Sequence, residues 1–307
     1  MQSVHTIGEG LAPALSTFLA VHRAGSISAA AHDLHLSQPA ISRRLQQLER
    51  QLGVALFDRV PGGLRLSSAG NVFLAYAERA DAAQRDAVAA VIDHRDRVSG
   101  TVDVGVVGSL VEPWLTTVLT SVAAEHPGVE LAVSTATSRQ IRDDVLRGAV
   151  TLGISYARPT EPSLSVRTLF EEELVVVAAP GHPRAGRSVR SLDALRDERW
   201  LVFPDQPGHP ESANSIARAL LAQHQVRADR VRPVDSLTAQ RALARAGYGL
   251  AFLPESAVAA DVAGGLLATV RVRGVRVAAP VTLLTRRNAY LSPAAQAVIR
   301  ELVGTSR

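Results

Sequence analysis

Residues 24–49, AGSISAAAHDLHLSQPAISRRLQQLE, contain two short helical patterns that are separated by a tight turn. Ser37 is a natural N-cap for the second helix, and Pro39 stands in its first turn, where a missing amide costs nothing. The second helix carries an apolar stripe, formed by Ile41, Leu45, Leu48 and Leu52. Its opposite side is polar and consists of Pro39, Arg43, Gln46 and Arg50, flanked by Ser42 and Gln47. This arrangement predicts a helix-turn-helix.

The neighbouring residues complete a small domain. An earlier helical pattern has apolar residues at Leu11, Leu15, Phe18 and Leu19. Gly53 ends the last helix, and residues 57–59 and 64–66 predict two short strands around 61–63, as in a wing. Because Gln can pair with adenine, Arg with guanine and Ser with either base or phosphate, the polar face suits DNA. An ordinary three-helix bundle with a solvated Arg/Gln face gives the same periodicity, so the pattern alone leaves both interpretations open.

A long helix follows from Ser68 to about Val98 and is rich in alanine. Small and apolar residues recur along it at alternating spacings of four and three, which is typical of a coiled-coil seam. The seam consists of Phe73, Ala77, Ala80, Gln84, Ala87, Val91, His94 and Val98. A single narrow stripe on such a helix predicts pairing with a second copy of the chain.

Beyond Gly100, strand patterns alternate with helical patterns, which predicts an α/β domain with a largely parallel sheet. The expected strands are residues 102–107, 129–134, 152–155, 174–178 and 250–253. The expected helices are residues 114–125, 139–147, 213–224 and 237–246.

Composition narrows the function classes. The chain of 307 residues has 33 basic residues, all of them Arg, against 29 acidic residues, a net charge of +4 and no Cys. Without Cys there are no disulfides, thiolate zinc sites or iron–sulfur clusters. Five Arg lie in Ser37–Leu66 against Glu49 and Asp58, so positive charge is concentrated in the helix-turn-helix region. No secretory signal or membrane-length apolar run is visible, and we expect a cytoplasmic protein without a membrane partner.

Residues 24–49, with LGVALFDR at 52–59 and LSSAG at 66–70, closely resemble the amino-terminal signature of LysR-type transcriptional regulators. Residues 169–184 and AGYGLAFLP at 246–254 also resemble this family, so the resemblance spans nearly the whole chain. Mild departures from the family pattern occur at Ser67, Thr116 and Thr151.

The resemblance implies an α/β protein with an all-α-plus-wing N-terminal domain. The implied domains are a winged helix-turn-helix at 1–67, a dimerising linker helix at 68–99, and an effector-binding module at 100–307. The module would resemble periplasmic solute-binding proteins, with one subdomain at about 100–170 and 271–307 and the other at about 171–270. The chain would cross between them near Arg167–Glu171 and Thr269–Arg273, and a small molecule would bind in the cleft.

The resemblance also implies partners. These are double-stranded promoter DNA, a small-molecule effector, and further copies of the chain in a homodimer through the linker helix and in a homotetramer. The residues expected to bind DNA are Ser37, Gln38, Pro39, Ser42 and Arg43, with Arg59 and Arg65 from the wing. Arg44 and Gln47 are alternatives that could instead serve contacts within the domain. Two recognition helices in a dimer require two half-sites about one helical turn apart.

Candidate effector ligands follow two expected strands. Ser109 ends a strand and opens a helix, where its hydroxyl and free amides suit a carboxylate or similar anion. Thr137 and Ser138 do the same after the next strand. The family pattern adds Phe203 as an apolar wall and Asp235 across the cleft. Helix capping without a ligand explains the hydroxyls equally well, and the sequence leaves both readings open.

Other chemistry finds little support. His32 and His35 have a metal-like spacing but no third ligand nearby, and no nucleophile motif or dinucleotide fingerprint is complete. We therefore expect no enzyme activity, no metal and no cofactor. Tyr156 stands where some family members place an Arg for an acidic ligand, which weakens the case for a dicarboxylate. The main interpretation is an effector-controlled, sequence-specific regulator; the alternatives are a ligand-free architectural DNA-binding protein and a solute-binding protein or α/β enzyme.

Overall fold

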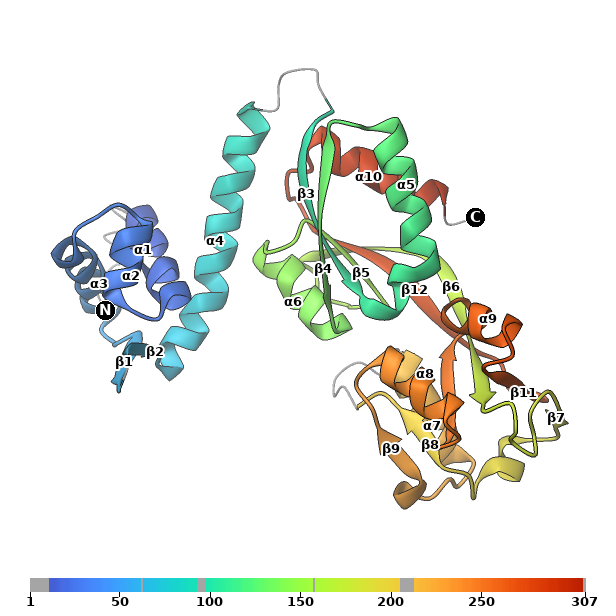
Figure 1. The fold of residues 1–307 in the computed structure, drawn as a ribbon. Coiled ribbons are helices and arrows are strands. Elements are labelled where there is room, and N and C mark those ends of the chain that lie inside the picture. Colours follow the sequence, from blue (N-terminus) through green and yellow to red (C-terminus); the bar gives the residue numbers. More distant parts are fainter. Residues whose placement is uncertain (1–10, 62, 93–97, 157, 205–212, 306–307) are drawn as a thin grey trace. The chain divides into compact units, whose positions relative to one another are not determined.

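The computed structural model describes residues 11–61, 63–92, 98–156, 158–204 and 213–305. The chain divides into two compact units, Met1–His94 and Arg95–Arg307, whose elements are labelled in Figure 1. No helix in the described ranges is long and apolar enough to cross a bilayer.

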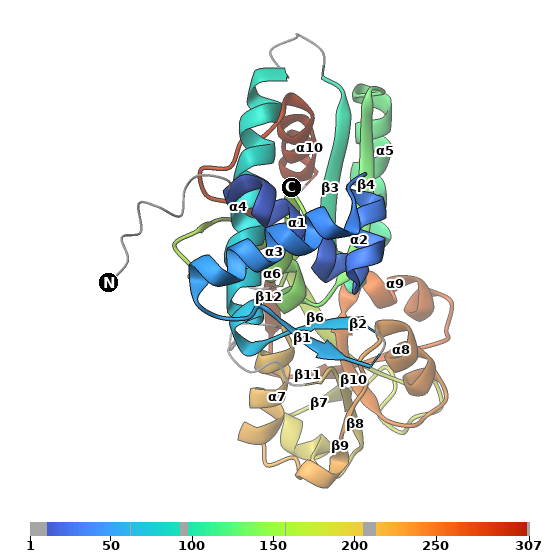
Figure 2. The ribbon, with the colours of Figure 1, turned by 90° about the vertical axis from the view of Figure 1, so that its left-hand side faces the viewer.

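The first unit is a three-helix domain with a hairpin. Helices α1 (Leu11–Ala24), α2 (Ile27–Asp33) and α3 (Gln38–Leu52) pack together beside strands β1 (Phe57–Val60) and β2 (Gly63–Leu66) (Figure 2). The two strands are antiparallel. This is the winged helix-turn-helix that the sequence predicts.

Local signals set the limits of α3. The Ser37 hydroxyl accepts a hydrogen bond from the Ala40 amide at 3.3 Å, and Gly53 ends the helix in a left-handed conformation with φ of 72°. Ile41, Leu45 and Leu48 are buried in the core of the domain. The predicted cap, stripe and stop are therefore confirmed.

The wing is attached to the domain by backbone contacts. The Leu64 amide donates to the Gly25 carbonyl at 2.9 Å, in the turn between α1 and α2. A Cβ atom on Gly63 would lie 2.5 Å from that same oxygen, so only glycine fits there. Ser67 donates to the Ala55 carbonyl at 2.7 Å and accepts from the Gly70 amide at 3.0 Å, which caps the next helix.

Helix α4 (Ser68–Ile92) has a different apolar face from the predicted one. Phe73, Ala77 and Ala80 pack against the core of the first unit, and Ala77 is fully buried. The first half of the predicted seam is therefore internal, because this part of the helix completes the small domain. The expected helical continuation falls on 93–97, outside the described residues, and Val98 is not helical. The large apolar side chains that α4 exposes are Val72, Tyr76, Val88 and Val91.

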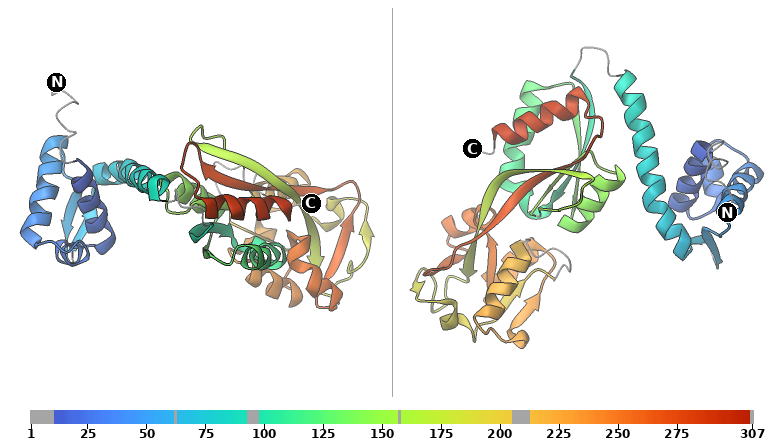
Figure 3. Two further views of the ribbon diagram at one scale, coloured as in Figure 1. Left: turned by 90° about the horizontal axis from the view of Figure 1, so that it is seen from above. Right: turned by 180° about the vertical axis from the view of Figure 1, so that it is seen from behind.

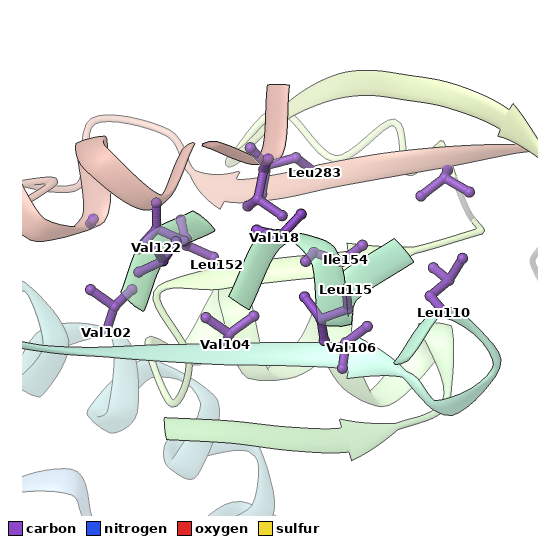
Figure 4. Close-up of a cluster of buried hydrophobic side chains, with 14 of the residues drawn as sticks. Val102, Val104, Val106, Leu110, Leu115, Val118, Val122, Leu152, Ile154 and Leu283 are labelled. Atoms are coloured by element: carbon purple, nitrogen blue, oxygen red, sulfur yellow. The ribbon is translucent and has the colours of Figure 1, made fainter. Parts of the chain in front are cut away.

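The second unit consists of two lobes. Lobe one contains strands β3 (Gly100–Val107), β4 (Val129–Ala136) and β5 (Leu152–Ser155) with helices α5 (Thr116–Glu125), α6 (Ser138–Arg147) and α10 (Pro293–Gly304). Helices α5 and α10 share one apolar core with β3 and β5, while α6 packs on β5 separately. Figure 4 shows the side chains that β3, β5 and α5 contribute to this core.

Lobe two contains strands β7 (Ser188–Val189), β8 (Trp200–Val202), β9 (Val231–Pro233), β10 (Leu250–Pro254) and β11 (Ala268–Val272) with helices α7 (Ala213–Gln223), α8 (Leu237–Arg245) and α9 (Glu255–Ala263). Helix α7 packs in one apolar cluster and α8 and α9 in another, because successive strand residues point to opposite faces of the sheet. Short helical turns are η2 (Gly108–Leu110), η3 (Val111–Leu115), η4 (Leu192–Leu195) and η5 (Ala228–Arg230).

Two long antiparallel strands join the lobes. Strands β6 (Leu164–Ala178) and β12 (Val277–Arg286) pair from Leu174 with Val277 to Leu164 with Arg286, and they run side by side in Figure 3. The strand order is β4-β3-β5-β12-β6-β10-β8-β9, with β11 beside β6 and β7. Lobe one pairs with β12, and lobe two pairs with β6.

The expectation of a largely parallel sheet is wrong, because the sheet is mixed. Strand β12 pairs antiparallel with both β5 and β6, and β10 and β11 pair antiparallel with β6. Strand β12 was absent from the sequence pattern because Pro280 interrupts a continuous apolar run. In the structure, Pro280 sits beside a β-bulge at Val281/Thr282. The second crossing is made by β12, later in the chain than the expected 269–273, which lies mostly in β11 within lobe two.

Gly70 gives a test of how the first unit closes. A Cβ atom there would lie 2.0 Å from the Leu56 carbonyl oxygen, with no flexible side chain that could move aside. We expect Gly70→Ala to destabilise the first unit by about 1–3 kcal/mol through overpacking. Urea unfolding followed by circular dichroism measures this. Gly304→Ala, which meets nothing within 4 Å, is the control; equal stability of the two variants would contradict the close approach.

Candidate functional sites

The first candidate site is the outer face of α3. Ser37, Gln38, Pro39 and Arg43 are exposed, and Ser42 is half-buried. Pro39 and Arg43 lie opposite the buried stripe and Ser42 flanks them, so the helix presents its polar side to solvent. Of the two alternatives, Arg44 is half-buried and Gln47 is exposed.

Two of the serines already have hydrogen-bond partners. The Ser37 hydroxyl caps α3, and the Ser42 hydroxyl accepts from Gln46 Nε2 at 3.4 Å. Arg43 forms no ion pair with any residue in the described part of the chain and is exposed. Its guanidinium is therefore free for an external acceptor.

The wing does not bring Arg59 and Arg65 to one face. Asp58 pairs with Arg65 and Arg59 pairs with Leu64 across the hairpin. Because directly opposed residues share a face and neighbours alternate, Arg59 and Arg65 point to opposite faces. Both are exposed, but a single flat surface cannot meet them in the same way.

Glu49 is a positioning residue that the sequence interpretation missed. Its Oε1 accepts hydrogen bonds from the Leu56 amide at 2.7 Å and the Phe57 amide at 3.3 Å. It therefore joins the last turn of α3 to the start of the wing. An acidic residue in the last turn of a helix opposes the helix dipole, and this signal could have indicated a local partner.

The second candidate site is a cavity of about 430 Å³ in the second unit. It is lined from lobe one by residues that follow β3, β4 and β5, and from lobe two by residues at the ends of β8, β9 and β10. Ligands bind at such strand ends in many α/β proteins. All five expected effector residues line it: Ser109, Thr137, Ser138, Phe203 and Asp235.

The hydroxyls at the start of α6 have different roles. Thr137 forms a capping box, in which its Oγ1 accepts from the Gln140 amide at 3.3 Å and donates to Gln140 Oε1 at 2.9 Å. Its side chain is thus committed to the helix. Ser109 and Ser138 are buried and line the cavity. The Ser109 hydroxyl lies beside the Tyr156 hydroxyl, whereas Ser138 has no side-chain hydrogen bond in the described part of the chain. The capping explanation therefore holds for Thr137 and does not extend to the two serines.

Tyr156 follows β5 and also lines the cavity. Its side chain is 6% exposed, and no group of the described residues meets hydrogen-bond geometry with its hydroxyl. Burial raises the pKa of Tyr156 well above its usual value; the nearby Ser109 hydroxyl acts in the opposite direction, and the negative charge of Glu172 raises it further. The hydroxyl consequently keeps its proton and remains a donor.

Lobe two contributes apolar walls and one charge. Leu174, Phe203 and Phe252 line the cavity. Asp235 is exposed and is the only charged residue among the described lining residues. It lies just before Ser236, whose hydroxyl caps α8.

Glu172 connects the crossing strands to lobe two. It lies on β6, is 7% exposed, and accepts from the Ser256 amide at 3.3 Å and the Ser256 hydroxyl at 2.9 Å. Burial raises the pKa of Glu172, the hydrogen bonds from Ser256 oppose that rise, and Glu255 adds to it. Nothing in the sequence pattern distinguished Glu172 from its two acidic neighbours.

Metal binding has no support from the described residues, which contain no group of three or more His, Asp or Glu side chains arranged around one point. His32 lies 3.7 Å from Asp33, and His35 adopts a positive φ of 51° in the turn between α2 and α3. Both histidines therefore have local roles in the structure.

Comparisons with known proteins find relatives for both units of the chain. Residues 13–71 match the model of the bacterial regulatory helix-turn-helix protein, lysR family, and residues 95–307 match the LysR substrate binding domain. The transcriptional regulator TfdS of Cupriavidus pinatubonensis is 28% identical over 298 residues, covering 95% of this chain and 96% of TfdS. TdfR of the same species is 30% identical over 250 residues, covering 80% of this chain and 82% of TdfR.

A solved structure is similar over the same length. Full-length CbnR in complex with its target DNA is 26% identical, with 96% of this chain and 99% of that chain covered and a TM-score of 0.65. A winged helix-turn-helix joined to a two-lobed α/β module defines a DNA-binding transcriptional regulator. The chain belongs to the LysR family of transcriptional regulators.

The raised pKa of Glu172 gives a pH-dependent prediction. A carboxyl whose folded pKa lies above the ordinary 4.5 stabilises the fold fully below that value, and this stabilisation is lost as pH rises through the folded pKa. Glu172→Gln keeps an acceptor for Ser256 and cannot ionise. We therefore expect the variant to gain stability relative to the wild type between pH 5 and pH 8 in urea unfolding.

The control for this experiment is Glu125→Gln, at the exposed end of α5. Its stability relative to the wild type should stay constant over the same pH interval. A Glu172→Gln variant that loses relative stability as pH rises would show that ionised Glu172 stabilises the lobe.

Proposed function

We propose that this chain is a sequence-specific transcriptional regulator that is controlled by a small-molecule effector bound between its two α/β lobes. The observation that carries the proposal is the cavity at the strand ends, which both lobes line and which belongs to a family-typical module. A purely architectural DNA-binding protein has no use for such a cavity, so the ligand-free alternative is disfavoured.

The DNA-binding surface is the outer face of α3 together with the wing. We assign its contacts to Ser37, Gln38, Pro39, Ser42 and Arg43, with Arg59 and Arg65 from the hairpin. The similarity to CbnR, which has been solved with its target DNA, supports this assignment. Arg59 and Arg65 lie on opposite faces of the wing, so the two residues cannot contact DNA in the same way. Arg43 is exposed on the outer face of α3, and we expect it to contact a base directly.

The oligomer forms through α4. Its second half exposes Val88 and Val91, at 58% and 77% of their full surface. These two valines are three residues apart, so they lie on one side of the helix. We assign the dimer contact to this side rather than to Phe73, Ala77 and Ala80, which are occupied within the domain.

Arg43→Ala tests the DNA-binding face. The target sequence of the wild-type protein can be identified by sequencing the fragments of source genomic DNA that the purified protein retains. We expect the variant to bind this target more weakly by roughly 1–3 kcal/mol. Its affinity for random DNA should fall less, because the bidentate contact of Arg43 with a base is made only on the target. Fluorescence anisotropy measures both.

Arg196→Ala removes the same charge from the second unit and should leave both affinities unchanged. Equal losses of Arg43→Ala on target and random DNA would reduce Arg43 to a phosphate contact. An unchanged affinity for the target would remove it from the interface.

The double variant Val88→Asp/Val91→Asp tests the α4 contact. Placing two like charges in an apolar interface should dissociate the dimer, because each carboxylate would be buried without a partner. Light scattering of the full chain gives the mass. The control, Ala75→Asp/Ala90→Asp, introduces the same charge at positions more than a quarter turn around the helix from both valines and should keep the dimer. A dimer that survives in the first variant places the contact elsewhere.

A further inference from the structure

The lobe-one side of the cavity offers hydroxyl groups that can donate hydrogen bonds. Ser138 has no side-chain partner among the described residues, and the Ser109 hydroxyl lies beside that of Tyr156. The first amides of α6, a helix of ten residues, have no acceptor within the helix, and the helix dipole is positive at that end. A helix start alone does not define a ligand, so the neighbouring side chains decide what this end can bind.

Tyr156 supplies the independent observation. Its hydroxyl is buried beside Ser109, and no group of the described residues meets hydrogen-bond geometry with it. Leaving a buried hydroxyl unpaired destabilises a protein, and native proteins rarely leave one so without a functional reason. An acceptor oxygen that enters the cavity would pair with Tyr156 and with the two serines together.

The lobe-two side of the cavity carries one acidic residue. Asp235 on lobe two forms no ion pair with any described residue, and the described lining contains no Arg, Lys or His. This is notable in a chain with 33 Arg residues. Glu172, behind Tyr156, makes the surroundings more negative. A second carboxylate on the ligand would therefore be repelled, whereas an ammonium group would pair with Asp235.

Much of the cavity lining is apolar. Leu174, Phe203 and Phe252 are among the apolar residues that line it together with the hydroxyls of lobe one and Asp235. A volume of about 430 Å³ suits a small molecule with a short hydrocarbon body.

We infer that the effector is a small zwitterion, whose carboxylate binds the Ser109, Ser138 and Tyr156 donors and whose ammonium group pairs with Asp235. This assignment rests on the proposed effector binding and specifies its chemistry. A dicarboxylate is excluded by the same residues, since it would place a second negative charge against Asp235.

Isothermal titration of the full-length protein with matched probes tests the class. The probes are 5-aminopentanoate, pentanoate and glutarate, which share a five-carbon chain, together with the standard α-amino acids. We expect an amine-bearing acid to bind tightest, by about 10-fold or more over pentanoate and glutarate, because a charge-assisted hydrogen bond is gained.

Two variants test the ammonium partner and the carboxylate partner of the ligand separately. Asp235→Asn should weaken the best amine-bearing acid by about 10-fold and leave pentanoate unchanged, whereas Tyr156→Phe should weaken both. Because the Tyr156 hydroxyl is unpaired, Tyr156→Phe should not lower the thermal stability of the ligand-free protein. Asp197→Asn, which alters an exposed Asp outside the cavity lining, is the matched control and should bind all probes as the wild type does.

Three results would overturn the assignment. Glutarate could bind tightest of the probes, Asp235→Asn could weaken pentanoate as much as the amine-bearing acid, or none of the amine-bearing acids could bind saturably. Tight binding of glutarate would reject the zwitterion while leaving effector control intact. Loss of DNA binding by the wild-type protein, measured separately, is the result that would reject the proposed function.

Discussion

The antiparallel pairing of β6 with β12 is the constraint on which the second unit depends. Strand β5 of lobe one pairs with β12, and strands β10 and β11 of lobe two pair with β6, so both lobes extend from one backbone ladder. The strand ends of the two lobes consequently line one cavity. Glu172 lies on this ladder and is hydrogen-bonded to α9, so its buried carboxyl joins the crossing to lobe two.

The first unit was predictable almost element by element, because its signals are local. A serine cap, a stripe at helical spacing and a terminal glycine define α3 without distant contacts. Strand β12 was not predictable from the sequence. It is buried on both sides, so it lacks the alternation of apolar and polar residues that is typical of a strand, and Pro280 interrupts its apolar run. The opposite orientation of Arg59 and Arg65 depends on the hairpin register, which the sequence does not state. The cavity residues were anticipated from cap positions and family pattern, but the commitment of Thr137 to Gln140 and the unpaired Tyr156 hydroxyl are tertiary facts.

Many Arg residues of the second unit form ion pairs with acidic residues that do not belong to the described lining of the cavity. In the second unit, Arg142 pairs with Asp143 and Glu161, Arg158 with Glu171, Arg241 with Asp261 and Arg276 with Glu173. These pairs hold guanidinium groups on the outside of the lobes or between helices. In the first unit, the Leu56 and Phe57 amides donate to the Glu49 carboxylate, and Glu49 forms no described ion pair with Arg43. The net charge of +4 is thus less informative than its distribution.

A ligand changes the arrangement of two lobes only if it binds one arrangement more tightly than another. A molecule held by lobe one alone has the same contacts whether the lobes are near or apart, and it shifts nothing. The donors at Ser109, Ser138 and Tyr156 belong to lobe one, whereas Asp235 belongs to lobe two. A ligand with a different group for each lobe gains its second interaction only when β6 and β12 bring the lobes to the correct separation. The two-ended chemistry of the cavity is therefore what would give such a ligand control over the module.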